Sequence, residues 1–323
     1  MRRFVGLSVC RFRPLVAALA LCALFGAGAA SAVPAAAKAG SGAITLRDDS
    51  GARVVLSGPA TRVVSLISGD TQIMLALGLR SRLVGVDTDS LQYMAAPYNR
   101  LTKGLPSIGN SYPTPSLERI AAVHPDLILT SEAVAGTAKL RSLGVPVVVL
   151  NPTNLPGIEH DVLLVGEATG AQAAARRVVA QIASSTRRLQ AIVRAQPRHP
   201  SVYVEIATDP YYAAGPGSYI DALVHVLGAV NAVDRTARVA YPELSSEAVV
   251  ALDPQVIVLD EPDVTPAQVA ARPGWQAVAA VADHRVYANV DVNALSEPGP
   301  AVTTALWQLA RDLYPAAFSP RRG

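Results

Sequence analysis

The chain has 323 residues, of which 28 are basic and 25 are acidic, so its formal charge is +3. Residues 1–32 hold four of the arginines and no acidic residue, which leaves 24 basic and 25 acidic residues in the rest of the chain. This balance argues against nucleic acid or an anionic membrane surface as a partner. Both cysteines, Cys10 and Cys22, also lie in residues 1–32. A disulfide, a thiol catalyst and a thiolate metal site are therefore excluded from residues 33–323.

Residues 1–32 have the pattern of a cleavable secretory signal. Arginines precede the apolar run Leu15–Phe25, and Ala30-Ser31-Ala32 fits a cleavage site. The run is shorter than a membrane span, which argues against an uncleaved anchor. The residue before Cys22 is a bulky leucine, which argues against a lipid anchor there. We predict a periplasmic or secreted protein whose signal is followed by a flexible leader at 33–43.

Beyond the leader, apolar runs of strand length alternate with helical patterns. A hairpin is predicted from Ile44–Leu46 and Val54–Leu56, joined by a turn at Gly51. Later strands are predicted at 62–67, 83–86, 126–130, 145–150, 202–206, 255–259 and 285–290. Helices are predicted at 71–77, 218–227 and 300–313, with one ending at Gly144 and one near Trp275, while 87–107 reads as a loop. The alternation predicts an α/β fold with parallel sheets covered by helices on both faces.

A long helical pattern separates the two series of strands. Asn154 or Thr153 can cap its start, Pro156 suits the first turn, and Pro197 follows its end. We predict one stiff bridging helix over 154–196, between an N-terminal lobe at 44–153 and a C-terminal lobe at 197–323. Glycines at 166 and 170 weaken the middle, so two ordinary helices are the alternative.

One sequence phrase occurs once in each lobe. Ser116-Leu-Glu118 and Ser245-Ser-Glu247 each stand seven residues, counted from the glutamate, ahead of a proline that opens an apolar run. Each copy predicts a serine-capped helix, a proline break and a buried strand. In a purely structural role, Glu118 and Glu247 would stabilise the first turns of their helices.

Ligands of parallel sheets bind beyond the carboxyl ends of the strands, so polar residues at these positions are site candidates. Tyrosines there suit a large, flat, partly apolar ligand. The predicted ligand-binding residues are Ser68, Asp70, Asp87, Tyr93, Asn110, Tyr112, Tyr211, Tyr212, Tyr241, Glu261 and Asn293.

The patterns of common catalytic and metal sites are missing from the sequence. The five histidines show no paired metal-ligand spacing, and no serine has an identifiable base. Gly215-Pro216-Gly217-Ser218 predicts a turn with a helix cap, because it lacks the lysine of a phosphate loop. We expect a binding protein with no metal site and no cofactor of its own. The alternatives are a chelatase using Asp70 with Asp87, and a sensor subunit.

The chain resembles the solute-binding proteins of ABC importers for iron chelates, haem and vitamin B12. The phrases that carry the resemblance are Thr45–Gly51, Arg62–Leu66, Ala76–Leu79, Val84–Asp87, Leu105–Gly109, Ser116–Glu118, Ala214–Asp221 and Tyr241–Glu247. It implies two Rossmann-like lobes, a ligand cleft between them and a monomeric protein. It also implies that Glu118 and Glu247 dock on arginines of the dimeric membrane permease.

The resemblance leaves the ligand open among a corrinoid, haem and a ferric siderophore, ranked in that order. Gly215–Asp221 and Tyr241-Pro242 look most like cobalamin-binding members. Haem-binding members usually carry a ligating tyrosine directly after the Ile-Gly pair, where this chain has Asn110, with Tyr112 two residues on. Any metal would arrive with the ligand, as a cobalt corrinoid or an iron chelate, and Tyr112 would ligate it only if the ligand were haem.

Overall fold

The computed structural model describes residues 42–319, so the predicted signal and nearly all of the leader lie outside the described residues. The predicted hairpin is confirmed as an antiparallel pair, β1 (Ile44–Arg47) and β2 (Arg53–Leu56). No helix among the described residues is long and apolar enough to cross a membrane.

A four-stranded parallel sheet follows the hairpin, in the order β4-β3-β5-β6. Its strands are β3 (Val63–Ser65), β4 (Leu83–Val86), β5 (Leu127–Thr130) and β6 (Val147–Val149). The connecting helices are α1 (Ser68–Ala76), α2 (Thr88–Gln92), α3 (Leu117–Ala122) and α4 (Thr137–Arg141), with short 3-10 turns at Arg80–Arg82 and Tyr98–Arg100. The loop predicted at 87–107 is therefore partly helical.

The second sheet is mixed, in the order β10-β8-β7-β11-β12, with β9 also paired to β7. Its strands are β7 (Ser201–Thr208), β8 (Tyr211–Ala213), β9 (Val230–Asn231), β10 (Glu243–Leu244), β11 (Val256–Leu259) and β12 (Val286–Tyr287). Strands β7, β11 and β12 pair in parallel, as predicted, and the unpredicted strand β9 also pairs in parallel with β7. The prediction missed the antiparallel pairing of β8 with β7 and β10.

The helices of the second half complete the α/β fold. They are α7 (Tyr219–Val226), α8 (Ser246–Leu252), α9 (Pro266–Ala270), α10 (Ala279–Ala282), α11 (Val292–Ser296), α12 (Val302–Leu313) and α13 (Pro315–Phe318), with 3-10 turns at Ala232–Arg235 and Trp275–Ala277. Ser218 caps α7, because its Oγ accepts a hydrogen bond from the Asp221 amide. The turn predicted at Gly215–Ser218 is thus a helix-capping turn.

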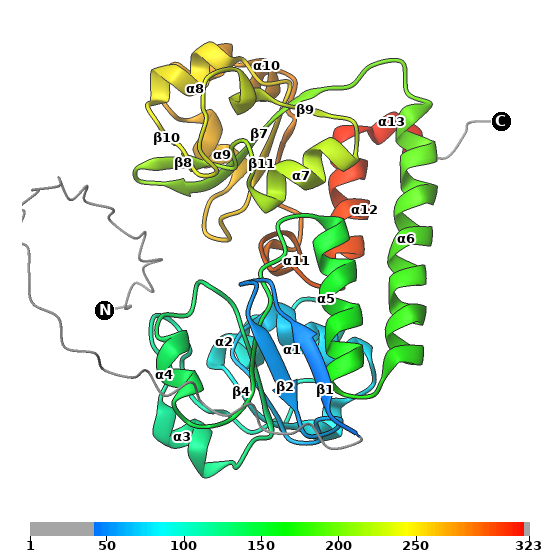
Figure 1. The fold of residues 1–323 in the computed structure, drawn as a ribbon. Helices are drawn as coiled ribbons and strands as arrows, with labels where there is room; N and C mark the ends of the chain where they lie inside the picture. The colour runs from blue at the N-terminus through cyan, green and yellow to red at the C-terminus, as the bar shows by residue number, and fades with distance from the viewer. Residues whose placement is uncertain (1–41, 320–323) are drawn as a thin grey trace, which may run out of the picture. The chain divides into compact units, whose positions relative to one another are not determined.

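The single bridging helix predicted at 154–196 is wrong. The segment forms two helices, α5 (Leu155–Ala168) and α6 (Gln172–Arg194), which lie side by side (Figure 1). Gly170 between them adopts a φ of +70°, which glycine tolerates and most side chains do not. The Ala171 amide bonds to the Gly166 carbonyl at 2.7 Å, so the first helix is terminated by a left-handed turn.

Helix α6 connects the two halves of the chain through its packing. Its early part contacts α5, and α12 of the second half also packs against it (Figure 1). The Trp307 indole of α12 donates to Ser185 Oγ of α6 at 2.9 Å. At 23 residues, the helix has a length of about 35 Å.

The repeated phrase folds as predicted in both copies. Ser116 caps α3 and Ser245 caps α8, and each helix leads to a strand whose four residues are all buried. The residue before each proline, His124 or Asp253, has a positive φ of 45° or 43°. Both residues are exposed.

Exchange of Gly166 for alanine distinguishes the paired helices from a continuous helix. A Cβ at Gly166 would lie 2.4 Å from the Ala175 Cβ on α6. We expect Gly166→Ala to lower the free energy of unfolding by about 1–3 kcal/mol through overpacking. In one continuous helix the same change would raise it by about 1 kcal/mol. Urea unfolding measures the difference, and Ala175→Gly added to Gly166→Ala should recover stability; a stabilised single variant would contradict the paired packing.

Candidate functional site

The first turn of α1 brings a carboxyl group to the end of β3. Ser68 and Asp70 are each only 4% exposed, and Asp70 Oδ2 has no hydrogen-bond partner within residues 42–319. Burial raises the pKa of Asp70 well above its ordinary value, and the nearby Asp87 and Glu297 carboxylates raise it further. A carboxylate this deeply buried holds a proton or needs a partner.

The next strand, β4, ends at a second buried carboxylate. Asp87 caps α2 by accepting hydrogen bonds from the amides of Asp89 and Ser90. Ser90 Oγ also bonds to the Asp87 carboxylate and to Thr71 Oγ1, which continues the polar chain to Ser65. Burial raises the pKa of Asp87, although the hydrogen bonds from Ser90 oppose the shift.

Two further carboxylates come from the second half of the chain. Asp260 follows β11 and accepts a hydrogen bond from Ser296 Oγ at the end of α11. Burial raises the pKa of Asp260 to about 7. Burial also raises the pKa of Glu297 to about 7, with contributions from Asp87, Asp89 and Asp260.

A close backbone contact joins these two groups of residues. A Cβ at Gly69 would lie 2.3 Å from the Pro298 carbonyl oxygen, and one at Gly299 would lie 2.6 Å from Gln72 Oε1. The Ala301 amide donates to the same Gln72 oxygen at 3.0 Å. The segment after α11 therefore lies directly on the first turns of α1.

These contacts define a carboxylate cluster, Asp70, Asp87, Asp260 and Glu297, at the strand ends of both sheets. No lysine or arginine forms a salt bridge with any of the four within residues 42–319. Glu205 differs from these four residues, because its buried carboxylate accepts two hydrogen bonds of 2.7 Å from the Arg272 guanidinium. The cluster is therefore a region of negative charge or of retained protons.

The predicted tyrosines divide into two groups. Tyr93, Tyr112 and Tyr241 are large exposed aromatics, at 49%, 43% and 53% exposure. The pKa of Tyr241 is raised by burial and then by the Asp260 carboxylate, which places this phenol beside the cluster.

Tyr211 and Tyr212 lie in strand β8, whereas the sequence predicted a strand-end loop for both. The Tyr211 ring packs 5.6 Å from that of Trp275 and 5.0 Å from the Arg272 guanidinium carbon. The Tyr212 hydroxyl donates to Glu243 Oε2 at 3.2 Å. Tyr211 is thus engaged in the packing of the second half.

The remaining predicted ligand-binding residues lie at separate points. Glu261 accepts a hydrogen bond from Thr208 Oγ1 at 2.5 Å, and Asn293 lies in the first turn of α11, where its amide donates to Asp291. Asn110 is exposed and lines an open pocket of about 830 Å³ at the start of α3. Glu118 lines the same pocket, so one predicted ligand residue and one predicted docking residue share it.

The two docking candidates occupy equivalent places. Glu118 and Glu247 are exposed and stand two residues after the capping serines of α3 and α8. The pKa of Glu247 is lowered by a hydrogen bond from its own amide and next by Ser245. Each carboxylate is therefore available at the surface.

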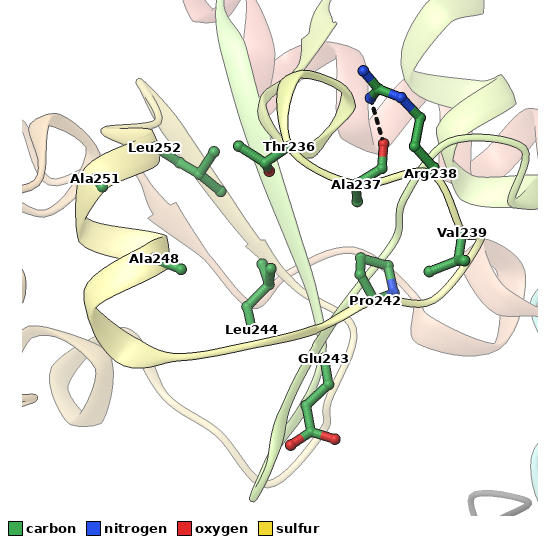
Figure 2. A pocket seen from close by; sticks show the side chains of 10 residues that line it. All are labelled: Thr236, Ala237, Arg238, Val239, Pro242, Glu243, Leu244, Ala248, Ala251 and Leu252. Carbon is green, nitrogen blue, oxygen red and sulfur yellow. Dashed lines mark hydrogen bonds between the residues drawn. The ribbon is translucent and has the colours of Figure 1, made fainter. Parts of the chain in front are cut away.

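A second pocket, of about 430 Å³, lies beside α8 (Figure 2). Figure 2 shows that its wall is largely apolar, with Val239, Pro242, Leu244 and Leu252 around it, and Arg238 bonded to the Ala237 carbonyl. The pocket contains none of the predicted site residues. Both helices that carry a docking candidate thus have a pocket beside them.

Sequence reasoning missed Asp260 and Glu297. The sequence signal for Asp260 was available, because it directly follows a predicted strand. Glu297 had no such signal, since only the contact of its neighbours with α1 brings it to the cluster.

Two sheets whose strand ends meet at one polar site define the two-lobe α/β fold of solute-binding proteins. The sequence model of the periplasmic binding protein family matches residues 63–289. The match covers more than half of the chain, which therefore belongs to this family.

Three similar proteins are each named for a binding role. It is 28% identical to the uncharacterized ABC transporter substrate-binding lipoprotein YvrC of Bacillus subtilis, over 85% of this chain and 87% of that one. It is 31% identical to a cobalamin-binding protein of Halobacterium salinarum, over 84% of this chain and 74% of that protein. The structure of the periplasmic heme-binding protein RhuT of Roseiflexus sp. RS-1 superposes with a TM-score of 0.70 at 27% identity. The superposition covers 80% of this chain and 99% of RhuT.

The pH dependence of stability tests the raised pKa of the Glu297 carboxyl group. Its pKa of about 7 lies above the ordinary value of about 4.3, so between these values the folded protein holds a proton that the unfolded chain releases. The stability contributed by this proton is complete below about pH 4 and is lost as pH rises to 7. We expect Glu297→Gln to raise the unfolding free energy at pH 8 by about 1–3 kcal/mol and to leave it nearly unchanged at pH 4.

Chemical unfolding at a series of pH values measures this effect. The control is Asp263→Asn, at an exposed acid in the loop after β11, which should show no such pH dependence. An equal gain for Glu297→Gln at pH 4 and pH 8 would contradict the raised pKa.

Proposed function

We propose that this protein is an extracytoplasmic solute-binding protein that captures a corrinoid and delivers it to an ABC importer. The observation that carries the proposal is the carboxylate cluster, with no basic residue paired to it within residues 42–319. A corrinoid presents amide side chains, which donate hydrogen bonds to carboxylates. Haem presents propionate carboxylates, and catecholate or carboxylate siderophores are also anionic; the ionised carboxylates of the cluster would repel these ligands.

The exposed tyrosines fit the same ligand. Tyr93, Tyr112 and Tyr241 offer ring faces for a flat macrocycle and hydroxyl groups for its polar edge. Tyr241 lies beside Asp260, so an apolar face and an acceptor for amide donors occur together. A relative at 31% identity is named as a cobalamin-binding protein, which supports this ligand class.

Haem is the second candidate ligand. The structural similarity to a protein named as heme-binding supports it, as does Tyr112 two residues after Asn110. In that case Tyr112 would ligate the iron. In either case the metal belongs to the ligand, and the role of the protein is capture and release without catalysis.

Delivery requires export and a membrane partner. A signal at residues 1–32 would place the protein outside the cytoplasm, with cleavage after Ala32. The Bacillus relative is named as a lipoprotein, so a lipid anchor at Cys22, with cleavage before that residue, is the alternative to release after Ala32. The proposed partner is a dimeric permease that binds the carboxylates of Glu118 and Glu247, one from each half of the chain.

Titration of the purified protein with cyanocobalamin, haemin and a ferric siderophore tests the ligand. We expect saturable one-to-one binding of cyanocobalamin by calorimetry and absorbance, weakened at least about tenfold by Tyr241→Ala through loss of a stacked ring. Val239→Ala, at an exposed residue of the same loop, is the matched control and should bind normally. A haemin Soret shift that Tyr112→Ala abolishes, without cobalamin binding, would replace the corrinoid with haem.

Transport by the permease reconstituted in vesicles tests docking. We expect Glu118→Gln with Glu247→Gln to leave ligand affinity unchanged and to reduce uptake at least about tenfold, more so at low salt, because surface charges set orientation and encounter rate. The control is Glu167→Gln, at an exposed acid of α5. Normal uptake by the double variant would remove the docking role and leave the ligand assignment standing.

A further inference from the structure

The buried carboxyl group of Asp161 is not among the ligand-binding residues proposed above. This residue of α5 is 0% exposed, and neither of its carboxyl oxygens has a hydrogen-bond donor within residues 42–319; its close side-chain neighbour is the carboxyl group of Asp49. A buried ionised carboxylate without a donor is costly by several kcal/mol. Its position therefore requires a neutralising proton or a cation.

Two metal-binding side chains converge on this carboxyl group. Asp49, in the turn between β1 and β2, and His160, beside Asp161 on α5, each offer a ligand atom, and the three ligand atoms lie within 4.8 Å of one another. His160 Nε2 is 3.9 Å from Asp49 Oδ1, so the pair is close without a hydrogen bond. The His160 side chain is 57% exposed, which gives an ion access from solvent.

The turn that carries Asp49 is held firmly in place. The Asp49 amide donates to the Val149 carbonyl at 3.0 Å, and its Oδ2 accepts from the Asn151 amide at 2.6 Å. Asp48 next to it accepts from Ser50 Oγ and from the Ala52 amide. The second oxygen of Asp49 is thus left to face His160 and Asp161.

We propose that Asp49, His160 and Asp161 form a binding site for a divalent cation of the zinc class. One imidazole nitrogen and two carboxylates suit Zn²⁺ and its transition-metal neighbours, whereas Ca²⁺ prefers oxygen ligands alone. Bound at this place, the ion joins the β1–β2 turn to α5. It therefore stabilises the first half of the chain, and none of its three ligands is a residue proposed for ligand binding.

A second cluster of the same residue types provides the matched comparison. Asp221, His225 and Asp234 also place three ligand atoms within 4.8 Å. There, both Asp221 oxygens accept hydrogen bonds, from Asn231 Nδ2 and the Gly217 amide. Both nitrogens of His225 lie 3.2 Å from a carboxylate oxygen, so this histidine already pairs with two acids.

Calorimetric titration of the tag-free, EDTA-treated protein with ZnCl₂ and CaCl₂ tests the proposal. We expect one zinc ion per chain and a rise in melting temperature with zinc, since a ligand of the folded state stabilises it. His160→Ala and Asp161→Asn should each weaken zinc binding at least about tenfold. His225→Ala should bind zinc as the unaltered protein does.

Three results would overturn the assignment: no zinc binding by the unaltered protein, loss of binding with His225→Ala in place of His160→Ala, or Ca²⁺ binding as tight as that of Zn²⁺. Because His160 is exposed, its alanine variant should fold even if Asp161→Asn does not. Binding of cyanocobalamin by His160→Ala is measured in parallel. An unchanged affinity there would show that the zinc result is independent of the proposed ligand.

Discussion

The rest of the site depends on the backbone contact between the first turns of α1 and Pro298-Gly299. At Gly69 and Gly299 the two segments approach so closely that a Cβ on either residue would overlap its neighbour. The bond from the Ala301 amide to Gln72 Oε1 fixes the same contact with a buried hydrogen bond. Because it is made by backbone and a short side chain, the contact has little freedom to adjust. It places Glu297 against carboxylates that arise more than two hundred residues earlier in the chain.

The features that the sequence predicted correctly are those encoded locally. The capping serines of α3, α7 and α8 each bond to a backbone amide three residues on, which requires only the right residue at the right spacing. The helix-proline-strand structure of the repeated phrase was also predicted correctly, since a proline directly before an apolar run marks where a helix ends and a strand begins. Asp70 and Asp87 were chosen as candidates because each lies within three residues of the end of a predicted strand.

The features that the sequence did not reveal depend on contacts between distant residues. The glycines at 166 and 170 left two helices as an alternative, but the close packing of Gly166 on Ala175, which holds the two helices together, does not appear in a helical pattern of apolar residues. The placement of Tyr211 depends on the antiparallel return of β8, and on the Trp275 and Arg272 side chains that cover it. Asp49, His160 and Asp161 escaped notice because the search for metal sites considered histidine spacing alone, whereas one of these ligands comes from a hairpin more than a hundred residues away.

Buried acids link the two proposed sites. The pKa of Asp161 is raised most by burial, next by Asp49 and then by the Asp70 carboxylate. The pKa of Asp70 is itself raised by burial and then by Asp87 and Glu297 of the carboxylate cluster. A cation bound at Asp161 would therefore reduce the negative potential at Asp70, and through it at the cluster. Linkage is reciprocal, so a ligand that donates hydrogen bonds to the cluster would alter cation affinity by the same factor. The sign of that coupling follows from charge. The cation and the ligand each reduce the repulsion among the buried carboxylates, so once one is bound the other gains less. We therefore expect each to lower the affinity for the other weakly.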